Sequence, residues 1–301
     1  MKKTLAMMTA AMMVAGALAG CGSSSSTPAA TTAAATEAAT TAAATETATD
    51  AATTEAAGDT AAAAEGTVKT PSGKFTVGFD QEFPPMGFVG DDGQFTGFDL
   101  DLAKEVASRL GLEFVPQPIN WDAKDMELDS GNIDCIWNGF TMQGREDAYT
   151  WVGPYMANNQ VFVVNADSDI ASKADLAGKA VEVQKDSSGL AALQSETELS
   201  ASFGSMTEVA DYNTALMDLE SGACDAVCMD SIVAGYQIKS SGKDMKILDD
   251  TLSAEEYGIG FKKGEDELAK AVYDTLMEMK DDGTVAKISN DWFGSDVFTL
   301  K

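Results

Sequence analysis

The sequence predicts an α/β fold built as two lobes, and three features of the chain support this prediction. At 301 residues the chain is long enough for two ordinary domains. Segments with strand periodicity alternate with segments of helical periodicity, which is typical of mostly parallel sheets covered by helices. A short sequence also occurs twice: residues 129–136 and 220–227 each place a helix end, a glycine and an Asp-led apolar strand in the same order. The repeat suggests two lobes built on one plan.

The spacing of apolar residues predicts the individual elements. Residues 75–79 alternate between the two faces of a strand. The apolar residues from Leu100 to Leu110 have helical spacing, and Gly111 is a typical helix end. Asp91-Asp92-Gly93 lacks the later ligands of a calcium loop, so we expect a hairpin turn there. The same criteria predict further strands at 180–183 and 226–229, and further helices at 189–195, 215–220 and 268–279.

Two of the predicted strands end in polar residues. One ends at Trp137-Asn138-Gly139 and the other at Met229-Asp230. Ligands of open α/β sheets bind beyond the carboxyl ends of the strands. Two such ends facing each other would form a ligand cleft between the lobes.

Charge and composition exclude several classes of function. The chain has 20 basic and 48 acidic residues, a net charge of −28, which disfavours binding to nucleic acid or anionic membranes. Histidine is absent, and the cysteines beyond Cys21 have no metal-ligand spacing, so we expect no metal. No phosphate-binding glycine loop occurs, and we expect no cofactor. Cys135, Cys224 and Cys228 are expected to be buried free thiols, the last two too far apart in one strand for a bridge.

The N-terminal segment predicts export and anchoring. Residues 1–20 have a basic start and a short apolar run, as a signal peptide does. Leu18-Ala19-Gly20-Cys21 resembles the lipobox of bacterial lipoproteins, which implies a diacylated Cys21. An ordinary secretory signal is the alternative. Residues 21–68 are mainly Ala, Thr and Ser, which predicts a disordered tether. We therefore expect an extracytoplasmic protein held at the cell membrane only by lipid.

The folded part resembles the polar amino-acid solute-binding proteins of ABC importers, bacterial solute-binding protein family 3. The resemblance covers about residues 73–294 and depends on many short motifs in one order. They are Val77-Gly-Phe-Asp80, Phe83-Pro-Pro85, Gly97-Phe-Asp-Leu-Asp-Leu-Ala103, Gly131-Asn-Ile-Asp134, Thr141 with Arg145, Pro154-Tyr155, Asp175-Leu-Ala-Gly-Lys179, Asp225-Ala-Val with Asp230, Tyr257-Gly-Ile-Gly260, Asp282-Gly283 and Trp292-Phe-Gly294.

The resemblance implies an architecture and a set of partners. Two lobes, residues 69–158 with 257–301 and residues 159–256, would be joined by two hinge strands crossing near 158–161 and 254–258. The lobes would close on the ligand like a trap. The implied ligand is a polar amino acid, with glutamine or a basic amino acid favoured. The implied partner is an ABC importer permease, and the protein would be a monomer.

The resemblance also assigns two charged residues to the two charges of an amino acid. Arg145 would hold the ligand α-carboxylate, because a guanidinium matches a carboxylate with two parallel hydrogen bonds. Its spacing from Thr141 is four residues where the family usually has five. Asp230 would bind the α-ammonium group. The alternatives are a solvated surface arginine and a helix N-cap.

Further predicted contacts surround these charges. Gly139 and Thr141 would offer backbone groups and a hydroxyl, and Asn138 would line the pocket. Ser187 and Ser188 precede a predicted helix, whose start suits a carboxylate; Asp186 replaces the glycine usual there. The remaining predictions concern the ligand side chain: aromatic contact from Phe83 and Trp121, with core packing as the alternative, and binding of its far end by Asp80, with a turn residue as the alternative.

Two other functions compete with uptake. A dehydratase on the same fold would need an acid and a base from Asp80, Asp230 or Glu182, since no histidine is available. A sensory module would use the same ligand trap to signal through a partner. We expect a binding protein and not an enzyme.

Overall fold

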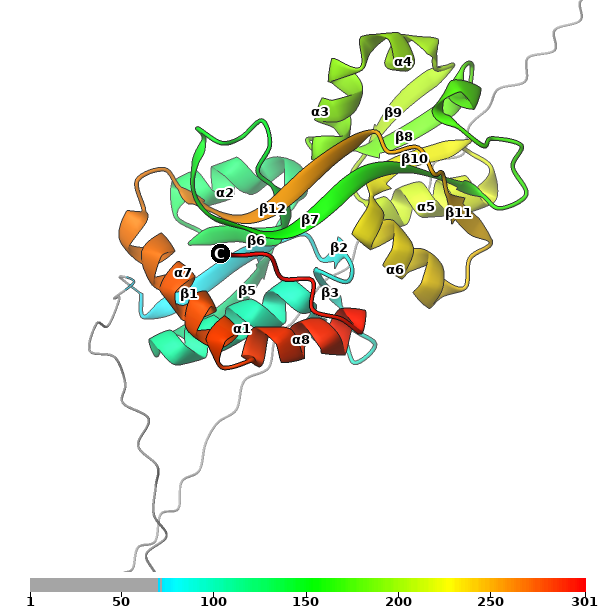
Figure 1. Ribbon diagram of the computed structural model, residues 1–301. Helices are drawn as coiled ribbons and strands as arrows, with labels where there is room; N and C mark the ends of the chain where they lie inside the picture. Colours follow the sequence, from blue (N-terminus) through cyan, green and yellow to red (C-terminus); the bar gives the residue numbers. More distant parts are fainter. Residues whose placement is uncertain (1–69, 71) are drawn as a thin grey trace, which may run out of the picture. The chain divides into compact units, whose positions relative to one another are not determined.

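The computed structural model describes residues 70 and 72–301 (Figure 1). These residues belong to one compact unit, 63–301. The predicted signal peptide, Cys21 and nearly all of the predicted tether lie outside the described residues, so those predictions stay predictions. Within the described part, no helix combines the length and the apolar character that a membrane span needs.

The first lobe contains a parallel sheet with β1 in the middle, between β5 and β6. A small antiparallel sheet of three short strands follows β1, and residues 91–93 form the turn between its last two strands, as predicted. The elements of this part are β1 (Lys74–Phe79), β2 (Glu82–Phe83), β3 (Gly87–Val89), β4 (Phe95–Thr96), α1 (Phe98–Leu110), β5 (Glu113–Pro118), η1 (Trp121–Ala123), α2 (Lys124–Ser130) and β6 (Cys135–Thr141).

The second lobe has a parallel sheet in the order β10-β8-β9, with β11 joined separately through β7. Figure 1 shows its helices around these strands. The elements are η2 (Lys173–Leu176), β8 (Ala180–Gln184), α3 (Ser188–Ser195), α4 (Thr197–Ser202), β9 (Ser205–Val209), α5 (Tyr212–Ser221), β10 (Ala226–Asp230), α6 (Ser231–Ser241) and β11 (Met245–Ile247).

Two long strands run through both lobes and join them into one nine-stranded sheet. They are β7 (Tyr149–Asn165) and β12 (Ser253–Lys262), which pair antiparallel along their length. β12 also pairs with β6 of the first lobe, and β7 with β10 of the second. After β12 the chain returns to the first lobe as α7 (Asp266–Asp281) and α8 (Thr284–Phe293), both packed on α1. The crossings predicted near 158–161 and 254–258 therefore lie in paired strands.

The repeated sequence has the same structure in both places. α2 and α5 each end at a left-handed glycine, Gly131 and Gly222, and each leads into a buried strand. The aspartate in front of each strand plays one role: Asp134 accepts a hydrogen bond from the Thr76 amide at 2.6 Å, and Asp225 accepts one from the Ala180 amide at 2.8 Å. Each carboxylate thus ties its strand to the neighbouring parallel strand.

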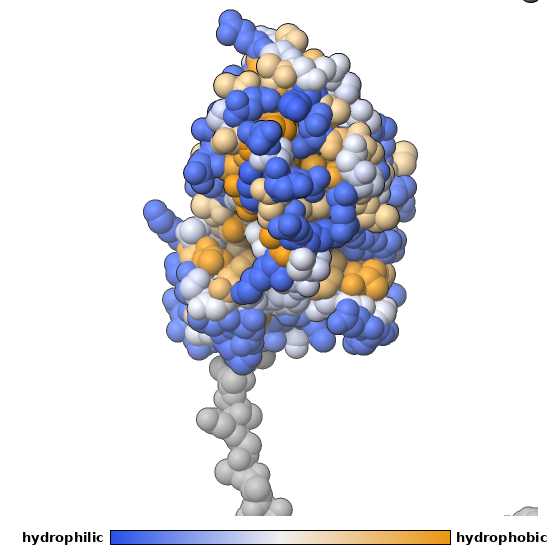
Figure 2. All heavy atoms as spheres, turned by 90° about the vertical axis from the view of Figure 1, so that its right-hand side faces the viewer, coloured by the Kyte–Doolittle hydropathy of each residue, from blue (hydrophilic) through white to orange (hydrophobic). Residues whose placement is uncertain are grey.

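Apolar residues of both lobes are buried in a core that covers the sheet. The predicted face of α1 is buried, and the helix ends at Gly111 as expected. The predicted helices at 189–195, 215–220 and 268–279 and the predicted strands all fall within observed elements of the same type. Figure 2 shows one face of the surface, where hydrophilic side chains predominate and hydrophobic ones are scattered.

The cysteines are free and buried, as predicted, but one detail of the prediction is wrong. Cys135, Cys224 and Cys228 form no disulfide in the described part of the chain. Cys228 lies inside β10, whereas Cys224 precedes it. The strand begins later because Gly222 ends α5 and the chain needs a short turn before it can pair with β8.

Gly97 is expected to be intolerant of any side chain. Its φ is +146°, and a Cβ added there would lie 2.3 Å from the Met86 carbonyl oxygen. Gly97→Ala should lower the free energy of unfolding by about 3 kcal/mol, measured by urea denaturation. Gly93→Ala is the matched control, because Gly93 also has positive φ but no atom within 4 Å of the added Cβ; it should cost about 1 kcal/mol. Equal losses would contradict the steric argument.

Candidate ligand-binding site

A small, partly open cavity lies where the two lobes meet. Eight of the ten predicted ligand-binding residues line it, together with Gln184, which the sequence analysis did not single out. The lining residues are Phe83, Trp121, Gly139, Thr141, Arg145, Gln184, Ser187, Ser188 and Asp230.

The cavity lies at the carboxyl ends of parallel strands from both lobes. β6 provides Gly139 and Thr141, β8 ends at Gln184, and β10 ends at Asp230. Gly139 has φ +55°, and an added Cβ would lie 2.9 Å from the Phe83 ring. The absent side chain therefore leaves room for the aromatic wall of the cavity.

The two lobes are closed against each other around this cavity. Thr141 of the first lobe donates a hydrogen bond to Ser188 of the second at 3.2 Å. Gln184 of the second lobe donates to Asp80 of the first at 2.7 Å. Both contacts bridge the cleft.

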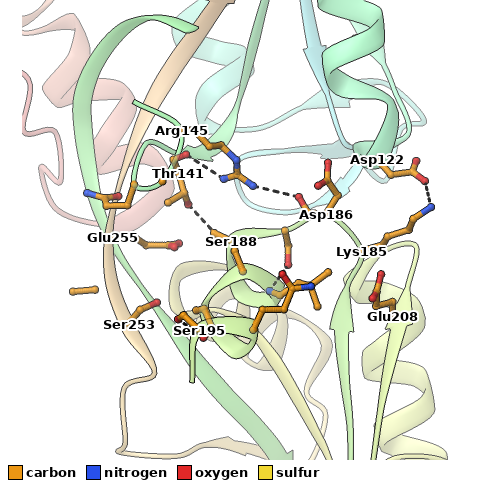
Figure 3. A pocket seen from close by; sticks show the side chains of 18 residues that line it. Asp122, Thr141, Arg145, Lys185, Asp186, Ser188, Ser195, Glu208, Ser253 and Glu255 are labelled. Carbon is orange, nitrogen blue, oxygen red and sulfur yellow. Dashed lines mark hydrogen bonds and ion pairs between the residues drawn. The ribbon is translucent and has the colours of Figure 1, made fainter. Parts of the chain in front are cut away.

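Arg145 reaches the cavity from the turn after β6. Its guanidinium donates to the carbonyl of Thr141 at 3.2 Å and to that of Asp186 at 3.3 Å, and it lies 5.1 Å from the Phe140 ring centroid (Figure 3). Among the described residues, no carboxylate forms an ion pair with Arg145. The four-residue spacing from Thr141 therefore still directs the guanidinium to the cavity, with its charge available to an anionic group.

Asp230 presents the opposite charge from the second lobe. It is buried, and its Oδ1 accepts hydrogen bonds from Tyr257 and Asn158, both at 2.7 Å. Although α6 follows directly, the Asp230 side chain makes no cap hydrogen bond. Instead, the side-chain Oδ1 of Asn158 accepts hydrogen bonds from the Ser231 hydroxyl and from the Ile232 backbone amide. The Asp230 side chain therefore does not serve as the N-cap of α6, which was the alternative role.

A second buried acid lies beside Asp230. Glu255 of β12 accepts hydrogen bonds from Asn158 at 2.7 Å and from Gln160 at 3.0 Å, so one amide bridges the two carboxylates. Burial, and then the charge of Glu255, raise the pKa of Asp230 well above its ordinary value. Within the described part of the chain, neither acid has a Lys or Arg partner. The pair would be stabilised by a cationic group in the cavity.

The start of α3 contributes two hydroxyl groups with different roles. Ser187 is the N-cap, and its hydroxyl accepts from the Leu190 amide at 3.0 Å. Ser188 accepts from Thr141 and from Gln160, so it lies between the first lobe and the crossing strands. Asp186, just before them, has φ +55°, the left-handed conformation that a glycine adopts easily. The turn thus keeps its geometry despite the aspartate.

Asp80 and Asn138 lie next to the cavity but do not line it. The two oxygens of Asp80 accept from the Glu82 amide at 2.9 Å and from Gln184, and burial raises its pKa to about 6. Asn138 accepts from the Asp80 amide at 3.1 Å. Asp80 also borders a neighbouring opening with Trp121 and Lys185. Asn138 supports Asp80, and Asp80 lies at the boundary between the small cavity and that opening.

The aromatic residues also have packing partners. Phe83 is buried with its ring 5.9 Å from that of Tyr212, and Trp121 packs edge-on against Phe140 at 5.5 Å. Both still border the cavity. Trp137, Trp151 and Tyr155 are not among its lining residues.

The model of the bacterial extracellular solute-binding proteins, family 3, matches residues 75–295. The chain belongs to this family. The family resemblance inferred from the motifs is therefore confirmed. The members of this family are solute-binding proteins, so this chain is a binding protein and not an enzyme, and the dehydratase alternative is set aside.

Relatives and solved structures agree with this assignment. The L-cystine-binding protein TcyJ of Escherichia coli (strain K12) is 33% identical over 231 residues, covering 75% of this chain and 84% of TcyJ. An ABC uptake transporter substrate-binding protein from Streptococcus pneumoniae with bound histidine is 34% identical, with a TM-score of 0.73, covering 76% of this chain and 95% of that one. Tv2483 bound to L-arginine is 28% identical, with a TM-score of 0.72, covering 76% and 93%.

Behind the cavity, this family-3 site depends on a fully buried carboxylate. Asp99, in the first turn of α1, accepts hydrogen bonds from the Gly139 amide at 2.7 Å and from Tyr155 at 2.8 Å. Burial raises the pKa of Asp99 to about 7. The carboxylate therefore holds Gly139 in place, and its protonation is linked to folding.

Asp99 should make stability depend on pH. Its pKa rises from 3.8 to about 7 on folding, so the stabilisation from the bound proton is full below pH 3.8 and is lost as pH rises to about 7. In this window Asp99 should contribute a fall of about 1.4 kcal/mol per pH unit in the free energy of unfolding. Asp99→Asn should remove that contribution, measured by urea denaturation between pH 4 and 8. An unchanged slope in the variant would contradict the assignment.

Proposed function

We propose that this family-3 protein captures a polar α-amino acid outside the cytoplasm and delivers it to an ABC importer. One observation carries the proposal: among the described residues, an arginine without a carboxylate partner and a buried aspartate without a cationic partner line the same small cavity. These two side chains complement the two charges of a zwitterion.

Arg145 and Asp230 would divide the ligand backbone between them. The guanidinium pairs with the α-carboxylate through parallel hydrogen bonds, with the Thr141 and Ser188 hydroxyls and the Gly139 backbone beside it. Asp230 accepts from the α-ammonium group. Because Glu255 lies beside Asp230, the ligand cation would offset repulsion between two buried acids, which favours bound ligand.

The ligand side chain would extend toward Phe83, Trp121 and the Asp80–Gln184 pair. Aromatic faces and a buried acid favour a cationic or amide end group. The relatives fit this class: TcyJ is a cystine-binding protein, and the two solved structures hold histidine and arginine. We propose cystine, glutamine and the basic amino acids as the candidates.

The paired strands β7 and β12 would act as the hinge between the two lobes, residues 69–158 with 257–301 and residues 159–256. A ligand that contacts both lobes stabilises the closed form through its differential affinity for that form. The importer permease would recognise the closed form. We propose that the protein acts as a monomer.

The N-terminal segment would place this site at the membrane. Removal of the signal peptide 1–20 and diacylation of Cys21 would anchor the chain, and residues 21–68 would act as its tether. Stable anchoring takes two lipid chains or an equivalent second signal, and diacylation supplies them.

A thermal-shift screen tests the proposed function. The purified protein, after unfolding, dialysis and refolding to remove bound ligand, is screened against the twenty amino acids, cystine and ornithine. A ligand that binds only the folded state raises the melting temperature. We expect a strong shift with one or a few polar amino acids. If no amino acid produced a shift, the proposal would fail.

Arg145→Ala should weaken binding of the amino acid found in this screen by about 3 kcal/mol, or more than a hundredfold in Kd, because the α-carboxylate would lose its charged partner. Isothermal titration calorimetry measures the effect. Arg109→Ala is the control, since Arg109 pairs with Glu105 and Asp282 away from the cavity and should leave Kd unchanged. Equal affinity of the Arg145 variant and wild type would show that Arg145 does not hold the ligand.

A further inference from the structure

Two turns face each other across the mouth of the cleft and exchange two ion pairs. The first turn, residues 121–124, consists of η1 and the first residue of α2 in the first lobe, and the second, residues 184–188, joins β8 to α3 in the second lobe. Lys124 of the first turn pairs with Asp186 of the second, and Asp122 of the first with Lys185 of the second at 2.6 Å. The charges are reversed between the pairs, and Figure 3 shows the second pair among the side chains that line a larger pocket next to the cavity.

The two pairs differ in the burial of their lysines. The Lys124 side chain is only 2% exposed, although its partner Asp186 is 52% exposed. The side chains of Lys185 and Asp122 are 55% and 40% exposed. Lys124 lies 5.2 Å from the Trp121 ring centroid. A buried ammonium without its carboxylate partner is strongly destabilising, whereas an exposed pair contributes little. The state of the Lys124 pair should therefore affect closure far more than that of the Lys185 pair.

Asp186 also connects the buried pair to the binding arginine. Its carbonyl oxygen accepts from the Arg145 guanidinium at 3.3 Å and from the Lys124 ammonium at 3.4 Å. Its backbone is left-handed, φ +55°, a conformation that non-glycine residues adopt uncommonly and that aspartate adopts more often than most. A glycine would make the same turn without strain, so the turn itself does not require the carboxylate. The ion pair with Lys124 is the interaction for which the structure uses the side chain.

We propose that Lys124 and Asp186 form an interlobe clasp that assembles on closure, positions Arg145 through the Asp186 carbonyl and sets the residence time of the ligand. The inference depends on the proposed function, because it requires that Arg145 binds the α-carboxylate of the amino acid. Opening the cleft separates Lys124 from Asp186 and removes one of the two carbonyls that hold the guanidinium. Ligand release therefore has to break the clasp, whereas the clasp is not needed for first encounter.

The clasp is tested by dissociation kinetics of the full-length protein. Stopped-flow tryptophan fluorescence measures kon and koff with L-arginine, L-histidine, L-glutamine and L-cystine as probes. Lys124→Met and Asp186→Asn, the latter tolerant of a left-handed backbone, should each raise koff about tenfold or more and change kon less than about threefold. Asp186→Gly should match Asp186→Asn, which excludes a backbone effect. The double variant should lose less than the sum of the single variants, because no buried charge is left alone.

Asp122→Asn is the matched control, since it breaks the exposed pair between the same two turns. Its effect on koff should be about twofold and should vanish at high salt, whereas the effect of Lys124→Met should persist. If the Lys124 and Asp186 variants released ligand no faster than Asp122→Asn, the clasp would be overturned. If the wild-type protein bound none of these probes or of the screened amino acids, the proposed function would fail instead.

A ligand-free measurement makes the clasp testable in either case. Spin labels at Met126→Cys in α2 and Gln194→Cys in α3, both exposed positions, report the distance between the lobes. Asp186→Asn should shift the distance distribution toward longer values, and Asp122→Asn should leave it unchanged. Identical distributions in all three proteins would show that the Lys124–Asp186 pair does not favour closure.

Discussion

The antiparallel pairing of β7 with β12 is the constraint on which the binding site depends. Each of these strands also pairs with a strand of one lobe, β6 for β12 and β10 for β7, so both lobes are fixed to the same two-stranded connection. The register places Asn158 opposite Glu255, under the end of β10. The carboxyl ends of β6, β8 and β10 then border one cavity, although these strand ends are spread along the chain between residues 139 and 230.

The same crossing explains why the buried acids at the cavity lack a cationic partner among the described residues. Burying a carboxylate is unfavourable unless hydrogen bonds or a cation compensate it. The amides of Asn158 and Gln160 compensate Asp230 and Glu255 in part, but hydrogen bonds cannot cancel the repulsion between two acids. Across the cavity, Arg145 is held by two carbonyls rather than by a carboxylate. The protein thus maintains separated opposite charges that a zwitterionic ligand would satisfy.

The contacts between the two lobes are a third feature of this arrangement. The contacts that bridge the lobes are polar: Thr141 with Ser188, Gln184 with Asp80, and the two ion pairs of the facing turns. Polar contacts of this kind replace contacts with water, so their net contribution to the free energy is small. Deep burial of one partner changes that balance, which is why Lys124 differs from the exposed lysine beside it.

The sequence by itself determined the local elements and most of the cavity. Apolar period and glycine stops predict β1, α1, α5 and α7, and the repeated helix–glycine–strand unit predicts two similar lobes because local sequence sets these features. The family resemblance located eight lining residues, four of them within the quoted motifs: Phe83, Thr141, Arg145 and Asp230. The edge strand β9 was missed because it is mostly exposed and lacks alternation.

Only the tertiary structure revealed Gln184, Glu255 and Lys124. Each is a polar residue whose burial depends on partners distant in sequence: Asp80 for Gln184, Asn158 for Glu255 and Asp186 for Lys124. Local sequence shows a polar side chain in a strand or at a helix start and cannot show which distant residues cover it. The burial of Gln184 and Lys124 exists only once the two lobes are brought together, whereas that of Glu255 depends on the pairing of β12 with β7.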